Sequence, residues 1–207
     1  MECRGAIQSF MIVLLIIISG PIFGADPVKK SYSGYMIMKK ESYIHVNGQS
    51  NINQFNCHYS YKDTIKFSGT YNEKALQLDH LSFHIPVKQF NCGNFIINKD
   101  FERLLKARHY PFIKLSVENI KIPDSADKNR VLTDTRMTLA GVTREYNMPL
   151  IYTKDPKGIY TIQGQTEINI KDFDINKLKK VFGIIRFKKT VKINFQFIFD
   201  VRNKFAN

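Results

Sequence analysis

The chain has 207 residues, of which 43% are hydrophobic and 13% aromatic, with 16 Phe and no Trp. This length suits one domain, and the hydrophobic fraction excludes an intrinsically disordered chain. The formal net charge of +13 favours acidic partners, such as an anionic membrane surface. The sequence has neither a G-x-S-x-G nucleophile elbow nor a Gly-rich phosphate-binding loop. These absences disfavour a serine hydrolase and a nucleotide-binding enzyme, so we expect a non-enzymatic protein without a cofactor.

Residues 1–24 have the pattern of a secretory signal peptide. Arg4 precedes an apolar run from Phe10 to Ser19, and Gly20 and Pro21 end that run. The run is shorter than the roughly twenty apolar residues that span a bilayer, which disfavours a membrane anchor. We therefore expect a periplasmic or secreted protein, with an N-terminal segment at residues 25–34 and one domain at residues 35–207.

Removal of the signal peptide leaves two cysteines, Cys57 and Cys92, each at the end of a Gln-Phe-Asn-Cys tetrapeptide. An oxidising compartment permits a disulfide between them. The alternative is a pair of small buried thiols on separate strands, because free cysteine packs well in protein cores. The sequence leaves both open, and we predict the disulfide.

Most of the remaining chain alternates apolar and polar residues with period two, which is typical of half-buried strands. The alternation runs through residues 55–67, changes phase near Asp79 and His80, where it indicates a bulge, and is clearest at residues 191–201. It predicts an inward set, Ile162, Ile168, Phe195 and Phe197, and an outward set, Gln163, Gln165, Asn194 and Gln196. About eight or nine long strands need a second sheet or closure into a barrel to protect their edges, and the pattern alone allows both.

One stretch departs from this alternation and predicts a short helix at about residues 98–108. Asn98 or Asp100 can serve as its N-cap, and Pro111 stops it because the residue before a proline favours an extended conformation. The apolar stripe of this helix must be buried against a sheet face or in the opening of a barrel. That stripe consists of Phe101, Leu104 and Leu105.

Several motifs follow one another in an order that is much more specific than any of them alone. They are I-P-V-x-x-F-x-C-G-N from Ile85, K-D-F-x-x-L-L-K-A-x-x-Y-P from Lys99, L-A-G-V-T-R from Leu139, K-D-F-D-I from Lys171, and Phe182-Gly183. Together they resemble the YceI-like family of lipid-binding domains over roughly residues 44 to 201. The resemblance implies an all-β fold, an eight-stranded antiparallel lipocalin-like barrel with one short helix. It also implies that an isoprenoid or another long-chain lipid is held in the barrel interior.

On this resemblance we expect a set of apolar side chains to bind the lipid. The set is Phe83, Phe101, Leu104, Leu105, Tyr110, Phe112, Leu115, Phe182, Phe195 and Phe197. We expect Phe101, Leu105, Tyr110 and Phe112 to lie near the mouth of the cavity. A carboxylate beside a hydrocarbon tail is costly, so Phe101→Asp or Leu105→Asp is expected to abolish lipid retention.

A basic stretch from Lys171 to Lys192 admits a different interpretation. It could form a rim that attracts anionic head groups or a membrane surface, or simply a solvated face whose lysines prevent strand pairing. The alternative function is therefore a solidly packed barrel that acts in a stress response or at a membrane surface.

Asp172 and Asp174 suit a turn better than acid–base chemistry. The histidines lack the spacing of a zinc site, and no nucleic-acid-binding module is present. The oligomeric state stays open, a homodimer included.

Overall fold

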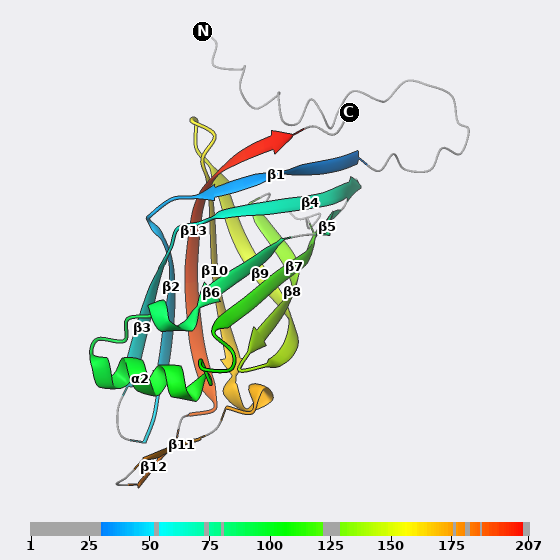
Figure 1. Cartoon of the computed structure of the whole chain (residues 1–207). Coiled ribbons are helices and arrows are strands. Elements are labelled where there is room, and N and C mark those ends of the chain that lie inside the picture. The colour runs from blue at the N-terminus through cyan, green and yellow to red at the C-terminus, as the bar shows by residue number, and fades with distance from the viewer. Residues whose placement is uncertain are drawn as a thin grey trace, which may run out of the picture.

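Among the residues that the structure describes, eight strands close into an antiparallel ring, which makes the fold a barrel (Figure 1). The computed structural model describes residues 30–51, 54–72, 75–79, 81–121, 129–175, 177–180, 183–186 and 188–204. The strands of the ring, in the order in which they pair, are β1 (Lys30–Met38), β4 (Thr64–Asn72), β5 (Ala75–Leu78), β7 (Phe112–Lys121), β8 (Arg130–Leu139), β9 (Val142–Lys154), β10 (Tyr160–Asn169) and β13 (Thr190–Lys204). β13 pairs with β1 and closes the ring. The predicted eight-stranded antiparallel barrel is confirmed.

The ring begins earlier in the chain than the sequence motifs suggested. β1 starts at Lys30, inside the expected N-terminal segment, and pairs with both β4 and β13. The expected signal peptide at residues 1–24 lies outside the described residues. In the described part of the chain no helix has both the length and the apolar character needed to cross a bilayer.

Three strands of the barrel are bent and interrupted. β2 (Ser42–Gln49) continues β1, since both strands pair with β13. On the other side, β3 (Gln54–Tyr61) pairs with β2 and continues as β4, which pairs with β1. β5 likewise continues as β6 (Ser82–Pro86), since both pair with β7. The bulge expected near Asp79 is thus a break between two strands, and His80 lies outside the described residues. The bulge lies in β7, where the register to β8 shifts between Val117 and Asn119. Breaks and bulges bend the strands and let the sheet curve into a barrel.

The helix α2 (Phe95–Leu104) begins before the predicted start at residue 98. Asn94 is its N-cap, and the Asn94 side chain accepts a hydrogen bond from the Ile97 N–H at 3.0 Å. Asn98, one of the two expected caps, lies inside the helix and accepts from the Cys92 N–H at 2.7 Å instead. The first residue with a short acceptor side chain after the Gly93 turn therefore starts the helix.

The helix also ends earlier than the Pro111 stop predicted. Lys106 adopts a left-handed conformation with φ 54°, and the N–H groups of Lys106 and Ala107 donate to the carbonyls of Arg103 and Glu102. This is a Schellman ending, which satisfies the last carbonyls of a helix without a proline. Ala107 is buried beside it, so the chain turns back toward the barrel at this point.

The core fills the inside of the barrel and follows the predicted alternation. Ile168 and Phe197 are buried and Ile162 and Phe195 are half-buried, whereas Gln163 and Gln165 are exposed. Asn194 and Gln196 are half-buried on the outer face, where Gln163 donates to the Gln196 side chain at 2.8 Å. Two short 3-10 turns, η1 (Val87–Gln89) and η2 (Ile170–Phe173), and a separate hairpin of β11 (Lys177–Lys180) and β12 (Gly183–Arg186) complete the described fold.

Candidate functional site

A row of apolar residues crosses four neighbouring strands on the inner face of the barrel. Leu150 of β9 lies opposite Gly164 of β10, which lies opposite Phe195 of β13 and, beyond it, Ile44 of β2. A side chain at Gly164 would overlap the Phe195 ring and the Leu150 side chain. The glycine therefore leaves interior space that these two side chains share.

The inner face around this row stays partly accessible. Leu150, Ile162, Ile193 and Phe195 are half-buried, although the alternation with exposed glutamines places them inside. Apolar side chains that keep accessible surface on the concave side of a barrel can pack against an apolar molecule. This inner face, defined by Leu150, Ile162, Gly164, Ile193 and Phe195, is the candidate site and is called the inner apolar face below.

An aromatic cluster bounds the inner apolar face. Phe83 of β6 stacks on Phe197 of β13, with ring centroids 5.2 Å apart, although these two strands do not pair. Tyr61 of β3 makes edge contacts with Phe83 at 5.8 Å and with Phe197 at 5.7 Å. Burial, and to a lesser extent the nearby Asp63 carboxylate, raises the pKa of Tyr61, so its hydroxyl stays protonated. The side chains of separate walls thus meet and fill the interior at this level.

The expected ligand residues of the helix lie in a different place. Phe101 packs on Phe90, with ring centroids 5.1 Å apart, and Phe90 stacks on Tyr59 of β3 at 5.3 Å. Phe101 and Leu105 are buried, and Leu104 is half-buried. These side chains attach α2 to the barrel, so a carboxylate at Phe101 or Leu105 would threaten the fold itself.

Two of the expected mouth residues are on the outside. Phe112 is 41% exposed and lies beside the exposed His84, which shares the outer face of the β6–β7 pair. Tyr110 is 43% exposed and lies against Gly141 in the β8–β9 turn, where φ is 86°. The expectation that Phe112 lines the cavity is wrong, because period two places the odd-numbered residues of this strand inside.

The other expected ligand residues divide between interior and undescribed positions. Leu115 is half-buried and lies opposite Phe83 on the inner face of the β6–β7 pair. Phe195 and Phe197 are neighbours on β13, with ring centroids 5.3 Å apart. Phe182 lies outside the described residues. Contact of these side chains with a lipid stays a prediction.

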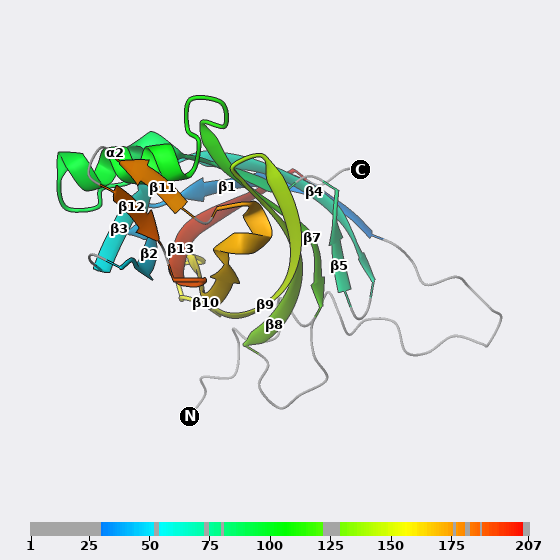
Figure 2. The same cartoon turned by 90° about the horizontal axis from the view of Figure 1, so that it is seen from below.

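The turn η2 closes one end of the barrel (Figure 2). Phe173 is fully buried and stacks on Tyr146 of β9, with ring centroids 6.2 Å apart. Asn169 caps this turn by accepting a hydrogen bond from the Lys171 N–H at 3.1 Å. Asp172 is exposed and Asp174 has a left-handed backbone with φ 57°, which fits a structural turn.

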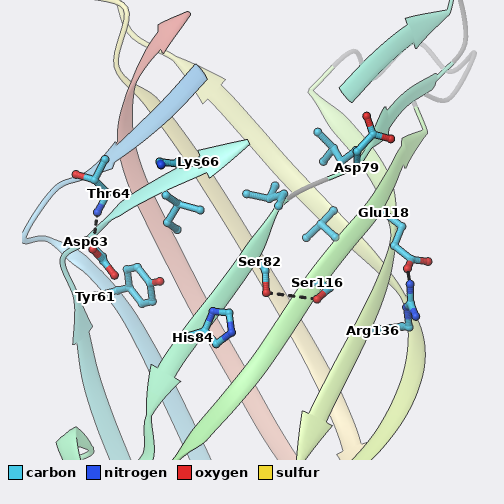
Figure 3. A pocket seen from close by; sticks show the side chains of 14 residues that line it. Tyr61, Asp63, Thr64, Lys66, Asp79, Ser82, His84, Ser116, Glu118 and Arg136 are labelled. Atoms are coloured by element: carbon cyan, nitrogen blue, oxygen red, sulfur yellow. Dashed lines mark hydrogen bonds and ion pairs between the residues drawn. The ribbon is translucent and has the colours of Figure 1, made fainter. Parts of the chain in front are cut away.

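A pocket of about 470 Å³ opens in the barrel wall between β4 and β6, where the strands do not pair (Figure 3). Its floor consists of core residues, among them Tyr61, Ile65 and Leu81. Its rim carries the acidic residues Asp63, Asp79 and Glu118, the basic residues Lys66 and Arg136, and His84. Arg136 forms an ion pair with Glu118, and Ser82 lies 3.4 Å from Ser116, oxygen to oxygen. A rim of mixed charge does not select a head group of one sign.

Two histidines form a pair on the outer face of β2 and β3. His45 lies opposite His58, with ring centroids 4.7 Å apart, and Tyr43 packs on His45 at 4.6 Å. Burial against these neighbours, and then the charge of His58, lowers the pKa of His45. Among the described residues, no three histidine, cysteine or acidic side chains converge in a geometry suited to a metal ion.

Comparison with known proteins identifies the family. The sequence matches the YceI-like domain over residues 35–199. The chain belongs to the YceI-like family. A polyisoprenoid-binding domain from Saccharophagus degradans, implicated in plant cell wall breakdown, has a similar structure, with a TM-score of 0.58 and 13% identity. That alignment covers 81% of this chain and 98% of the other, and at this identity the likeness shows a shared fold.

Two further solved structures are similar to the YceI-like chain. BcnA from Burkholderia cenocepacia is 13% identical with a TM-score of 0.47, and the match covers 81% of this chain and 95% of BcnA. A YceI protein from Campylobacter jejuni is 11% identical with a TM-score of 0.42, and the match covers 92% of each chain. No curated protein matches the sequence.

The sequence reasoning missed several residues around the inner apolar face. Leu150 and Gly164 were not among the expected ligand residues, although both lie in alternating strands. Tyr61 was recognised only as part of such a strand, and its contact with Phe83 and Phe197 depends on strands that do not pair. The alternation could have identified the first two residues. Nothing in the sequence indicates the aromatic cluster.

Proposed function

We propose that this YceI-like protein binds an isoprenoid or another long-chain lipid in its barrel and carries it outside the cytoplasm without catalysing a reaction. The observation that carries the proposal is the inner apolar face. Its apolar side chains point into a closed barrel and yet keep accessible surface. Membership of the YceI-like family supports the proposal, as does the polyisoprenoid-binding domain with a similar fold.

The physical mechanism is shielding of the apolar chain from water. Each methylene group removed from water contributes about 0.8 kcal/mol, so a long prenyl or acyl chain provides a large gross driving force. The free-energy cost of ordering the flexible chain on binding offsets part of this driving force. Among the side chains that define the face, no charged group competes for this surface.

The experiment that tests this proposal fills the inner apolar face with a ring. Thr166 is half-buried on the inner side of β10, opposite Ile193, and its neighbour Gln165 is exposed on the outer side. We expect Thr166→Phe to lower the amount of co-purified lipid several-fold, and the matched control Gln165→Phe to leave it unchanged. Lipid is measured by extraction and mass spectrometry of protein purified without detergent, with native mass spectrometry for stoichiometry.

Circular dichroism and thermal melting separate loss of lipid from loss of fold. A folded Thr166→Phe variant that retains the same lipid at the same stoichiometry would refute binding at this face. Purified wild-type protein without any lipid, which also takes up none from solution, would refute the proposal altogether.

A specific observation favours a second function, that of a packed barrel acting through its surface. The contact of Phe83 with Phe197 fills the interior at one level, as in a protein without a ligand cavity. Such a protein would act in a stress response or at a membrane through its basic face. The lipid extraction distinguishes the two functions, because only the carrier retains lipid inside the barrel.

A further inference from the structure

Two apolar side chains protrude from the first turn of α2. Phe95 is 74% exposed and Ile96 is 66% exposed, more than any other large hydrophobic side chain among the described residues. The helix does not need them for its own packing, because Phe101 and the half-buried Ile97 hold it to the core. Adjacent exposed apolar side chains of this size commonly mark an interaction surface.

Basic side chains lie beside Phe95 and beyond the far end of the helix. The Lys99 Nζ atom lies 5.6 Å from the centre of the Phe95 ring, and Lys106 and Arg108 are exposed at the other end of the helix. The acidic residues of α2 are paired within the helix, Glu102 with Lys99 at 3.0 Å and Asp100 with Arg103 at 3.8 Å. The helix therefore presents no unbalanced negative charge near Phe95.

The hairpin of β11 and β12 lies next to α2 at the same end of the molecule (Figures 1 and 2). Residues 175–189, which include this hairpin, contain no acidic residue. Their basic residues are Lys177, Lys179, Lys180, Arg186, Lys188 and Lys189. Lys188 and Lys189 are exposed, and the Lys188 N–H donates to the Gln49 carbonyl at 2.7 Å, which ties this segment to β2. Lys188 and Lys189 thus add exposed positive charge at the end of the molecule that carries α2.

We propose that this end of the molecule docks onto an anionic lipid bilayer, with Phe95 and Ile96 inserted among the lipids and the exposed Lys188 and Lys189 facing the head groups. The pairing of apolar anchors with lysines is the combination that binds a surface of anionic phospholipid. Two side chains on a convex helix end are too few for a stable protein interface, which buries about 800 Å² per partner. Partial insertion into a bilayer needs only the side chains themselves.

The docking surface goes beyond lipid binding in the barrel and does not depend on it. Its described residues, Phe95 and Ile96 of α2 with Lys188 and Lys189, are separate from the inner apolar face. A barrel with a packed interior could dock in the same way. For a carrier, docking would bring the barrel to the membrane that supplies or receives its lipid.

The test uses the whole protein with its disulfide intact and two kinds of vesicle, phosphatidylcholine alone and an equal mixture of phosphatidylcholine and phosphatidylglycerol. We expect flotation with the mixed vesicles, weakened by salt, and none with phosphatidylcholine alone. Phe95→Ser with Ile96→Ser, or Lys188→Gln with Lys189→Gln, should lower the apparent affinity roughly tenfold or more. The matched controls, Ile151→Ser and Lys157→Gln, change exposed residues of β9 and of the following turn and should bind like wild type.

Insertion has a direct readout, because the chain contains no Trp. The Phe95→Trp variant should show a blue-shifted emission with mixed vesicles, and an Ile151→Trp variant should not. Binding with an unshifted Phe95→Trp emission would overturn insertion. Equal binding by the Phe95/Ile96 variant, or no binding to mixed vesicles, would overturn the docking surface. Lipid retention in the barrel is measured separately, so failure of one proposal leaves the other intact.

Discussion

Cys57 in β3 is joined by a disulfide to Cys92, which lies just before α2, with the two Cα atoms 4.0 Å apart. The prediction that the two cysteines bridge is confirmed. Their neighbours in the chain, His58 after Cys57 and Asn91 before Cys92, exchange two backbone hydrogen bonds of 2.8 Å. β3 and β6 do not pair in the described sheet, so this short junction holds α2 to the edge of β3 together with the stacking of Phe90 on Tyr59.

Removal of the disulfide should therefore lower the stability of the protein. The bond closes a loop between positions 35 apart in sequence, for which chain-entropy arguments give about 3–4 kcal/mol. We expect Cys57→Ser with Cys92→Ser to lower the free energy of unfolding by about that amount in urea titrations. Wild type in reducing buffer is the matched control and should behave like the double variant. Equal stability of oxidised and reduced wild type would contradict this.

A single substitution at the end of α2 should act in the opposite direction. Lys106 holds a left-handed backbone at φ 54°, which costs a non-glycine residue about 1 kcal/mol. Lys106→Gly should raise the free energy of unfolding by about this amount, since glycine adopts this conformation freely. Lys106→Ala is the control, because it removes the same side chain and keeps the strain. A Lys106→Gly variant no more stable than the Lys106→Ala variant would show that the left-handed backbone at this position carries no free-energy cost.

The fold was largely predictable because burial on one side imposes a period of two. Ile168 and Phe197 were placed inside and Gln163 and Gln165 outside by alternation alone. The breaks that divide β1 from β2 and β3 from β4 were not predicted. They arise from the curvature of the closed barrel, which no local pattern in the sequence records. The helix start was misplaced because Asn98 or Asp100 was expected as the cap, whereas Asn94, which follows the Gly93 turn directly, is the N-cap.

The candidate site was less predictable than the fold. Phe195 was placed by alternation, whereas Phe112 was expected near the mouth of the cavity and lies on the outer face. The contact between Phe83 and Phe197 joins residues on strands that do not pair. Such contacts depend on how the barrel closes, so they become visible only in three dimensions.

The stacked pair Phe83 and Phe197 should be strongly coupled. Each single substitution to Ala removes a buried ring and should lower the free energy of unfolding by about 3–5 kcal/mol. The double variant should lose less than the sum, with a coupling energy of about 0.5–1.5 kcal/mol from the ring contact. Urea titrations of the four proteins give this value. Strict additivity would indicate that the two rings do not meet in solution.

The histidine pair predicts a dependence of stability on pH. His45 faces His58 across the β2–β3 pair, and burial together with the His58 charge holds the pKa of His45 below its ordinary value of 6.5. Between the lowered pKa and 6.5, the unfolded chain binds more protons at this position than the folded protein does. The free energy of unfolding should therefore rise with pH through that window and keep its full value above 6.5.

Substitution of the pair separates this effect from other titrations. His45→Gln removes the group with the lowered pKa, so part of the rise in stability through the window should disappear. His58→Gln should make this rise smaller, because it removes the neighbouring charge. His109→Gln changes an exposed histidine after α2, away from the pair, and should leave the rise unchanged. The measurement is the urea midpoint from about pH 5 to about pH 8, with the His45 titration followed by NMR. If the His45→Gln variant kept the full wild-type dependence of stability on pH, that dependence would originate outside the histidine pair, because the cross-strand contact would then contribute nothing to proton binding.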